Sequence, residues 1–213
     1  MKVYIEVVTG FLGSGKTSFI NALLSVTLIE TEKVVILQCE KGNIAIENKF
    51  LMDDRIFLAE YIPDKPLTKG FIIHIIELYK PHRIIIEYNG TRPINELLDI
   101  IYSKELKAIC KLTTAFHMAE AKTFELFLSN FGGILIPCIE VSNMILINDI
   151  DSINKSQLNN VRTKLNSLNP YAHIVEIANN SSIKDVIYKS KIMDNGILKK
   201  IRIGFKDLFI KES

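Results

Sequence analysis

The sequence feature that most constrains the fold is the stretch GFLGSGKT at residues 10–17, which fits the phosphate-binding pattern G-x-x-x-x-G-K-[ST] at every fixed position. An apolar run at residues 3–8 precedes it and predicts a buried strand, and apolar residues at helical spacing follow it in residues 18–24. The alternative is a glycine-rich turn that carries a lysine by chance, and the agreement of the motif with both flanks argues against it. We therefore expect this chain to bind a nucleoside triphosphate, or to descend from a protein that did.

The chemistry of such a loop assigns a role to each part of the motif. Its glycines let successive backbone N–H groups point at phosphate oxygens, and the helix that follows adds the positive end of its dipole. Lys16 would reach the β- and γ-phosphates, and the Thr17 hydroxyl would ligate Mg²⁺. The residues of this stretch that we expect to contact the nucleotide are Gly10, Gly13, Ser14, Gly15, Lys16, Thr17 and Ser18.

Composition excludes several classes of protein. The net charge of +2 and the absence of a lysine or arginine cluster argue against a dedicated nucleic-acid binder. No apolar run approaches the ~20 residues that cross a bilayer, and the N-terminus enters a strand without the pattern of a signal peptide. The three cysteines, Cys39, Cys110 and Cys138, lie far apart and fit a reducing compartment better than a disulfide framework. These observations predict a cytoplasmic protein that does not enter a membrane.

Apolar strands alternate with amphipathic helices along the chain. That order predicts an α/β fold of the P-loop NTPase type, with a mostly parallel central sheet and helices on both faces. We expect one nucleotide-binding domain over residues 1–213, with a core at about residues 1–178. A tail at 179–213 is expected to hold a short helix near residues 183–188 and an edge strand at 200–205.

Two boundaries in the middle of the chain are less regular. Residues 106–114 are apolar enough to predict a strand, and residues 119–129 have helical spacing. Because glycine commonly ends helices, the sequence Phe131-Gly132-Gly133 predicts that this helix stops there.

Glu87 stands at the end of the apolar strand predicted at residues 83–87. A carboxylate in that place behaves like a Walker-B acid, which reaches Mg²⁺ directly or through water. The alternative is an ordinary surface acid at a strand end, and the three isoleucines before Glu87 and the glycine soon after it favour the functional interpretation. That glycine, Gly90, could offer its backbone N–H to the γ-phosphate.

Glu40 follows the strand predicted at residues 33–39, so it is expected at the same rim of the sheet. Its carboxylate could hold Mg²⁺ through water or orient the attacking water. A solvated loop acid is an equally open alternative. We assign catalysis to Lys16, Glu40 and Glu87, and metal binding to Thr17, Glu40 and Glu87.

Asn148 and Asp151 follow another predicted strand with the spacing of the guanine-specificity motif N-K-x-D. The aspartate of that motif accepts hydrogen bonds from N–H groups that adenine lacks. Here Asp149 replaces the lysine, and a polar turn after a strand is common in any case. The pair favours GTP over ATP and leaves ATP open.

Taken together, these motifs resemble the CobW/HypB/UreG group of P-loop GTPases, and most closely its CobW branch. The resemblance covers roughly residues 3–177 and rests on five segments in order, VTGFLGSGKTSFINALL, CEKGNIAIEN, IIIEYNGTRP, IEVSNMILINDID and LNPYAHI. It implies a protein that binds GTP and Mg²⁺, hydrolyses GTP slowly, and delivers a metal or assists metal-centre or corrinoid assembly.

The sequence also departs from that family. The family's C-x-C-C metal motif should fall near residues 61–70, which contain no cysteine. The lysine of N-K-x-D is missing. Family members often have an aspartate after the strand that corresponds to the one predicted at residues 106–114, and His117 stands at that position here. About 35 residues remain after the core, so we expect the separate C-terminal domain of longer members to be absent.

The leading interpretation is a GTPase that acts as an accessory protein. Residues 40–47 would reorder with the γ-phosphate and change affinity for a partner protein that receives a metal or cofactor. The runner-up is a regulatory module that binds nucleotide without hydrolysing it. A small-molecule kinase comes third, because no arginines cluster as a lid would need. The expected partners are nucleotide and protein, not nucleic acid or membrane, and a homodimer is left open.

Overall fold

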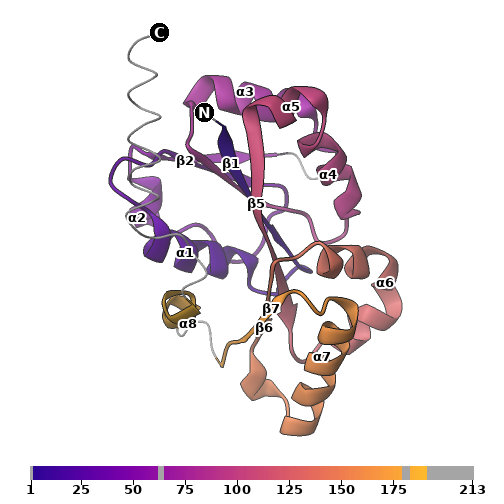
Figure 1. Cartoon of the computed structure of the whole chain (residues 1–213). Coiled ribbons are helices and arrows are strands. Elements are labelled where there is room, and N and C mark those ends of the chain that lie inside the picture. The colour runs from indigo at the N-terminus through magenta and orange to yellow at the C-terminus, as the bar shows by residue number, and fades with distance from the viewer. Residues whose placement is uncertain (1, 62–64, 179–182, 191–213) are drawn as a thin grey trace.

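The computed structural model describes residues 2–61, 65–178 and 183–190 and is built around one sheet of parallel strands (Figure 1). Its strand order is β3-β2-β4-β1-β5-β6-β7, and every described pair is parallel. The strands are β1 Val3–Thr9, β2 Val34–Gln38, β3 Ile56–Glu60, β4 Arg83–Glu87, β5 Cys110–Glu120, β6 Met144–Asn148 and β7 His173–Glu176. The predicted P-loop α/β fold is therefore confirmed.

Helices cover both faces of this sheet. Figure 1 shows α1 and α8 on one side and α4 and α6 on the other. The helices are α1 Lys16–Thr27, α2 Asn48–Leu51, α3 Lys69–Tyr79, α4 Ile94–Ile101, α5 Lys104–Ile109, α6 Phe124–Glu140, α7 Lys155–Leu168 and α8 Ile183–Ser190, with a 3-10 turn at Ile150–Ser152. Within the described ranges, no helix is both long and apolar enough to cross a membrane.

The isoleucine-rich strands are explained by burial on both faces. Ile85 of β4 packs with Phe19 of α1, while its neighbours Ile84 and Ile86 pack on the opposite face with Ile72 of α3. Successive side chains of a strand point to opposite faces, so a strand covered on both sides is apolar throughout. α8 closes the first face by packing against α1.

The structure corrects the two irregular boundaries. The strand expected at 106–114 is α5 followed by β5, because β5 pairs with β1 only from Cys110 onward. The helix expected at 119–129 begins at Phe124 and continues past the glycines to Glu140, with a non-helical residue at Phe131. Leu135, Cys138 and Ile139 are buried there, and this packing overrides the weak helix propensity of glycine. The strand expected at 200–205 lies outside the described residues.

The register brings three strand ends to one level. Glu87 of β4 lies opposite Val8 of β1 on one side and opposite Gln38 of β2 on the other. The glycine-rich loop leaves β1 at this level, so the loops after β1, β2 and β4 meet at the carboxyl edge of the sheet. Ligands of open α/β sheets bind at that edge.

Candidate functional site

The glycine-rich loop between β1 and α1 has the backbone that its sequence predicts. Gly10, Gly13 and Gly15 have φ values of 136°, 85° and 96°, in the region that side chains rarely adopt. Space is also limiting, because a Cβ on Gly10 would lie 2.5 Å from the Met118 carbonyl oxygen. The loop can therefore curl tightly over β5 and deliver the chain to the first turn of α1.

Lys16 is the first residue of α1, and its ammonium group folds back over the loop. It donates hydrogen bonds to the carbonyl oxygens of Gly10 at 2.7 Å and Phe11 at 2.9 Å, and it forms an ion pair with Glu40. The residue is only 3% exposed. The ammonium group predicted to bind phosphates is thus held over the loop by oxygen atoms of Gly10, Phe11 and Glu40.

Thr17 and Glu87 form the oxygen-rich floor of the site. The Thr17 hydroxyl donates to Glu87 Oε1 at 2.6 Å, and Gln38 Nε2 donates to Glu87 Oε2 at 2.7 Å. Glu87 is 2% exposed. Burial raises its pKa above the usual value, against the lowering effects of the two hydrogen bonds and of Lys16. A buried carboxylate whose charge is disfavoured gains from a nearby cation, and one carboxylate with a hydroxyl suits Mg²⁺.

The loop after β4 touches the glycine-rich loop through backbone atoms. A Cβ on Gly90 would lie 2.2 Å from the Gly10 carbonyl oxygen, so only glycine fits there. The Gly90 N–H donates to Glu40 Oε2 at 3.1 Å. Glu40 therefore reaches Lys16 with one carboxylate oxygen and Gly90 with the other.

Lys16, Thr17, Glu40 and Glu87 line one pocket with a volume of about 420 Å³, whereas Gly10 and Gly90 are not among the described residues on its wall. Most of the predicted nucleotide-binding residues line it. The predicted site residues on its wall are Gly13, Gly15, Lys16, Thr17, Ser18, Glu40, Glu87 and Asn148. Ligand pockets typically have volumes of about 300–1,000 Å³, so this one is large enough for a nucleotide.

Asn148 and Asp151 are placed differently from one another. Asn148 is 6% exposed, and its Nδ2 donates to the Ser14 carbonyl oxygen at 3.3 Å. Its Oδ1 has no hydrogen-bond partner among the described residues. Asp151 is exposed on the 3-10 turn, outside the described residues that line the pocket. The structure thus brings Asn148, but not Asp151, into contact with the glycine-rich loop.

Comparison with known proteins decides the family. The nucleotide-binding domain of the CobW/HypB/UreG family matches residues 4–176. The chain belongs to the CobW/HypB/UreG family. No curated protein matches the sequence.

Solved structures of similar fold include members of this family. The Zn(II)-bound YjiA GTPase from E. coli is 16% identical, with a TM-score of 0.63 over 82% of this chain and 57% of the YjiA chain. The hydrogenase maturation factor HypB from Archaeoglobus fulgidus is 14% identical, with a TM-score of 0.56 over 90% and 88% of the two chains. The receptor FtsY from Elizabethkingia anophelis, in complex with GDP, is 15% identical, with a TM-score of 0.57 over 87% and 60%. Likeness at these identities shows the fold, and the chain spans little more than half of YjiA.

Potential metal ligands do not cluster within the described residues. In the part of the chain that the structure describes, no group of three or more His, Cys, Asp or Glu side chains is arranged to hold a metal ion. Cys39 and Cys138 are buried, and burial raises their pKa values to about 12 and about 11. Both are therefore neutral thiols, whereas metal binding requires the thiolate. Cys39 packs in the core beside the site, as expected of a small apolar residue.

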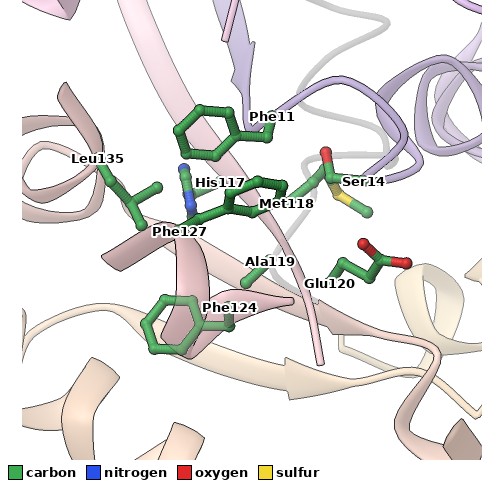
Figure 2. A pocket seen from close by; sticks show the side chains of 9 residues that line it. All are labelled: Phe11, Ser14, His117, Met118, Ala119, Glu120, Phe124, Phe127 and Leu135. Carbon is green, nitrogen blue, oxygen red and sulfur yellow. The ribbon is translucent and has the colours of Figure 1, made fainter. Parts of the chain in front are cut away.

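A second, small cavity lies under the glycine-rich loop (Figure 2). His117 lines it and lies within β5, so the expectation that His117 follows this strand is wrong; the strand continues to Glu120. The Thr9 hydroxyl donates to the Phe116 carbonyl oxygen at 3.0 Å, which leaves His117 Nδ1 to donate to Thr9 at 2.9 Å. His117 Nε2 then has no partner among the described residues.

Residues that line this cavity pack the glycine-rich loop against α6. Phe11 stacks on Phe127 of α6, with ring centroids 4.3 Å apart. Ser14 lines this cavity and is not among the described residues that line the nucleotide pocket, and its buried hydroxyl too has no partner within the described ranges. The structure therefore does not bring the Ser14 side chain to the wall of the nucleotide pocket, where the sequence analysis expected it.

Two residues of the site escaped the sequence analysis. Gln38 holds Glu87, and Asn21 of α1 holds the segment after Glu40 by donating to the Ala45 carbonyl oxygen and accepting from the Glu47 N–H. Asn21 is buried on the apolar face of α1. The only signal in the sequence was that Asn21 is polar among the apolar positions of the predicted helix. Its partners, Ala45 and Glu47, could not be predicted because they are more than 20 residues away.

Proposed function

We propose that this protein is a GTP-binding switch that hydrolyses GTP slowly with Mg²⁺ and assists metal or corrinoid assembly in a partner protein. The observation that carries the proposal is the convergence of Lys16, Thr17, Glu40 and Glu87 on one pocket, with the Gly90 N–H bonded to Glu40. A cation on a glycine-rich loop, a hydroxyl paired with a buried carboxylate, and a close backbone N–H are what phosphoryl chemistry requires.

The donor set of the pocket fits Mg²⁺. Thr17 and Glu87 would hold the ion, with Glu40 reaching it directly or through water, and phosphate oxygens and waters would complete its shell. Bound there, Mg²⁺ would neutralise charge that develops on the phosphates. Lys16 would hold the β- and γ-phosphates, and Gly90 would donate its N–H to the γ-phosphate. Glu40 would orient the attacking water.

We propose that the base is guanine. Asn148 supports this because one N–H of its side-chain amide braces the glycine-rich loop, which leaves the second N–H to donate to the O6/N7 edge of guanine. Asp151 would accept the guanine N–H groups, which requires the exposed 3-10 turn to meet the base. Asp149, with a left-handed φ of 56°, supplies no cation to support the base, so we expect a modest preference.

The segment at residues 40–47 is proposed as the switch whose conformation a partner protein recognises. Glu40, Gly42 and Ile44 line the nucleotide pocket on one side and, on the other, a further pocket of about 330 Å³ that is distinct from the cavity under the glycine-rich loop. Movement at the γ-phosphate would therefore reshape a surface outside the nucleotide site. YjiA has been crystallised with Zn(II), and HypB is named a hydrogenase maturation factor. We propose a comparable role in the cytoplasm, exerted by residues 1–213 as one domain with its core at about residues 1–178.

Single-turnover hydrolysis tests the proposal. Excess purified protein is mixed with labelled GTP or ATP and Mg²⁺, with and without candidate metals, and product is followed over hours. Slow conversion of GTP, faster than that of ATP and absent in Lys16→Ala, is the expected result. Tight GTP binding without product would favour the non-hydrolysing regulatory module. No binding of either nucleotide would overturn the proposal.

A further inference from the structure

Glu40 occupies an unusual place, because its two oxygens meet the two groups assigned to the γ-phosphate. One oxygen pairs with the Lys16 ammonium, and the other accepts the Gly90 N–H at 3.1 Å. The side chain of Glu40 is only 10% exposed in this arrangement. A carboxylate and the edge of a phosphate present similar pairs of anionic oxygens to such donors.

We propose that Glu40 fills the γ-phosphate position in the nucleotide-free protein and thereby determines the choice between GDP and GTP. The inference rests on the proposed function. A diphosphate can bind while Glu40 keeps both contacts, whereas a triphosphate must displace the carboxylate before its γ-phosphate reaches Lys16 and Gly90. Without Mg²⁺, the displaced carboxylate would also lie close to the added negative charge.

Only a short segment has to move to release Glu40, because hydrogen bonds hold the chain on both sides of it. On one side, the Cys39 N–H donates to the Glu87 carbonyl oxygen at 2.9 Å. On the other side, Asn21 holds Ala45 and Glu47 through their backbone atoms, at 3.1 and 3.0 Å. Release of Glu40 therefore needs only residues 40–44 to move, and this stretch includes Gly42.

Mg²⁺ reverses the effect that Glu40 has on triphosphate binding. A Cβ on Gly42 would lie 3.9 Å from Thr17 Oγ1, so the segment passes over the oxygens proposed to bind the ion. A carboxylate released from Lys16 is then close enough to join that ion, directly or through water. Glu40 therefore weakens triphosphate binding in the absence of Mg²⁺ and strengthens triphosphate binding when Mg²⁺ is present.

Affinities for GDP and GTP, each measured in EDTA and in Mg²⁺, test this inference. Displacement of a fluorescent GDP analogue gives the ratio of GTP to GDP affinity for wild type, Glu40→Gln and Glu40→Asp. Aspartate is one methylene shorter and cannot span both donors. Glu60→Gln is the control. Glu60 ends the neighbouring strand β3, so this substitution removes the same charge at a position outside the nucleotide pocket.

In EDTA, we expect both Glu40 variants to raise the ratio of GTP to GDP affinity about tenfold, the equivalent of one charge-assisted hydrogen bond, and Glu60→Gln to leave it unchanged. In Mg²⁺, the gain of Glu40→Gln should shrink or reverse. An unchanged or lower ratio in EDTA, with wild type binding both nucleotides, overturns the inference and leaves the proposed function intact. A wild type that binds neither nucleotide in either buffer overturns both.

Discussion

Replacement of Gly90 by alanine is the perturbation whose cost the structure defines most closely. The new Cβ would lie 2.2 Å from the Gly10 carbonyl oxygen and 2.8 Å from the Phe11 Cα. Both are backbone atoms, so no flexible side chain can move aside, and the two loops must separate by about 1 Å. Overpacking of this kind costs about 1–3 kcal/mol, which corresponds to a melting temperature lower by roughly 2–12 °C at this chain length.

The same displacement should weaken triphosphate binding, because it moves the Gly90 N–H and the loop that carries Lys16. Differential scanning calorimetry gives the change in stability, and GTP titration gives the change in affinity. Gly133→Ala is the matched control, since a Cβ there meets nothing within 4 Å and the residue lies in α6. That variant should be more stable by about 0.5–1 kcal/mol. A Gly90→Ala protein with wild-type melting temperature and GTP affinity would refute the close contact of the two loops.

Three further predictions follow from individual contacts. Lys16→Ala should abolish triphosphate binding and retain the circular dichroism spectrum, so unchanged GTP affinity in calorimetry would contradict its role. Glu87→Gln should weaken Mg²⁺-dependent binding; since burial raises the Glu87 pKa, this variant should also raise the melting temperature of the nucleotide-free protein at neutral pH, with the gain fading as the pH falls towards 4.5. Burial lowers the pKa of His117 to about 3 from 6.5, so the unfolded chain takes up that proton first as the pH falls. The free energy of unfolding should therefore decrease by up to about 1.4 kcal/mol per pH unit across this interval, and His117→Asn should remove that part of the slope in urea titrations.

The sequence was sufficient where function depends on local spacing. The motif at residues 10–17 predicts the strand, the loop and the first turn of α1, because its glycines are required by backbone conformation alone. Glu40 and Glu87 were predicted at one rim because parallel strands place their carboxyl ends together. Their identity as acids after apolar runs was visible without any knowledge of the sheet order.

The contacts between these residues were not predictable, because they depend on which strands are neighbours. Glu40 meets Gly90 only because β2 lies next to β4, and Gln38 reaches Glu87 for the same reason. The end predicted for α6 was wrong for a related reason. Its glycines predict an end, and the burial of Leu135 that carries the helix past them comes from distant strands.

Competition binding of GTP, ATP and XTP tests the central claim most directly. If the protein is a GTP switch, GTP should bind wild type about tenfold more tightly than ATP, the value expected from one charged acceptor hydrogen bond to the base. Asp151→Asn should narrow that gap and favour XTP, since the amide keeps one acceptor for N1–H but replaces the other with a donor, which suits the 2-oxo group of xanthine and not the amine of guanine. ATP binding as tightly as GTP to wild type would contradict the guanine assignment and leave a nucleotide-binding protein that is not a GTP switch.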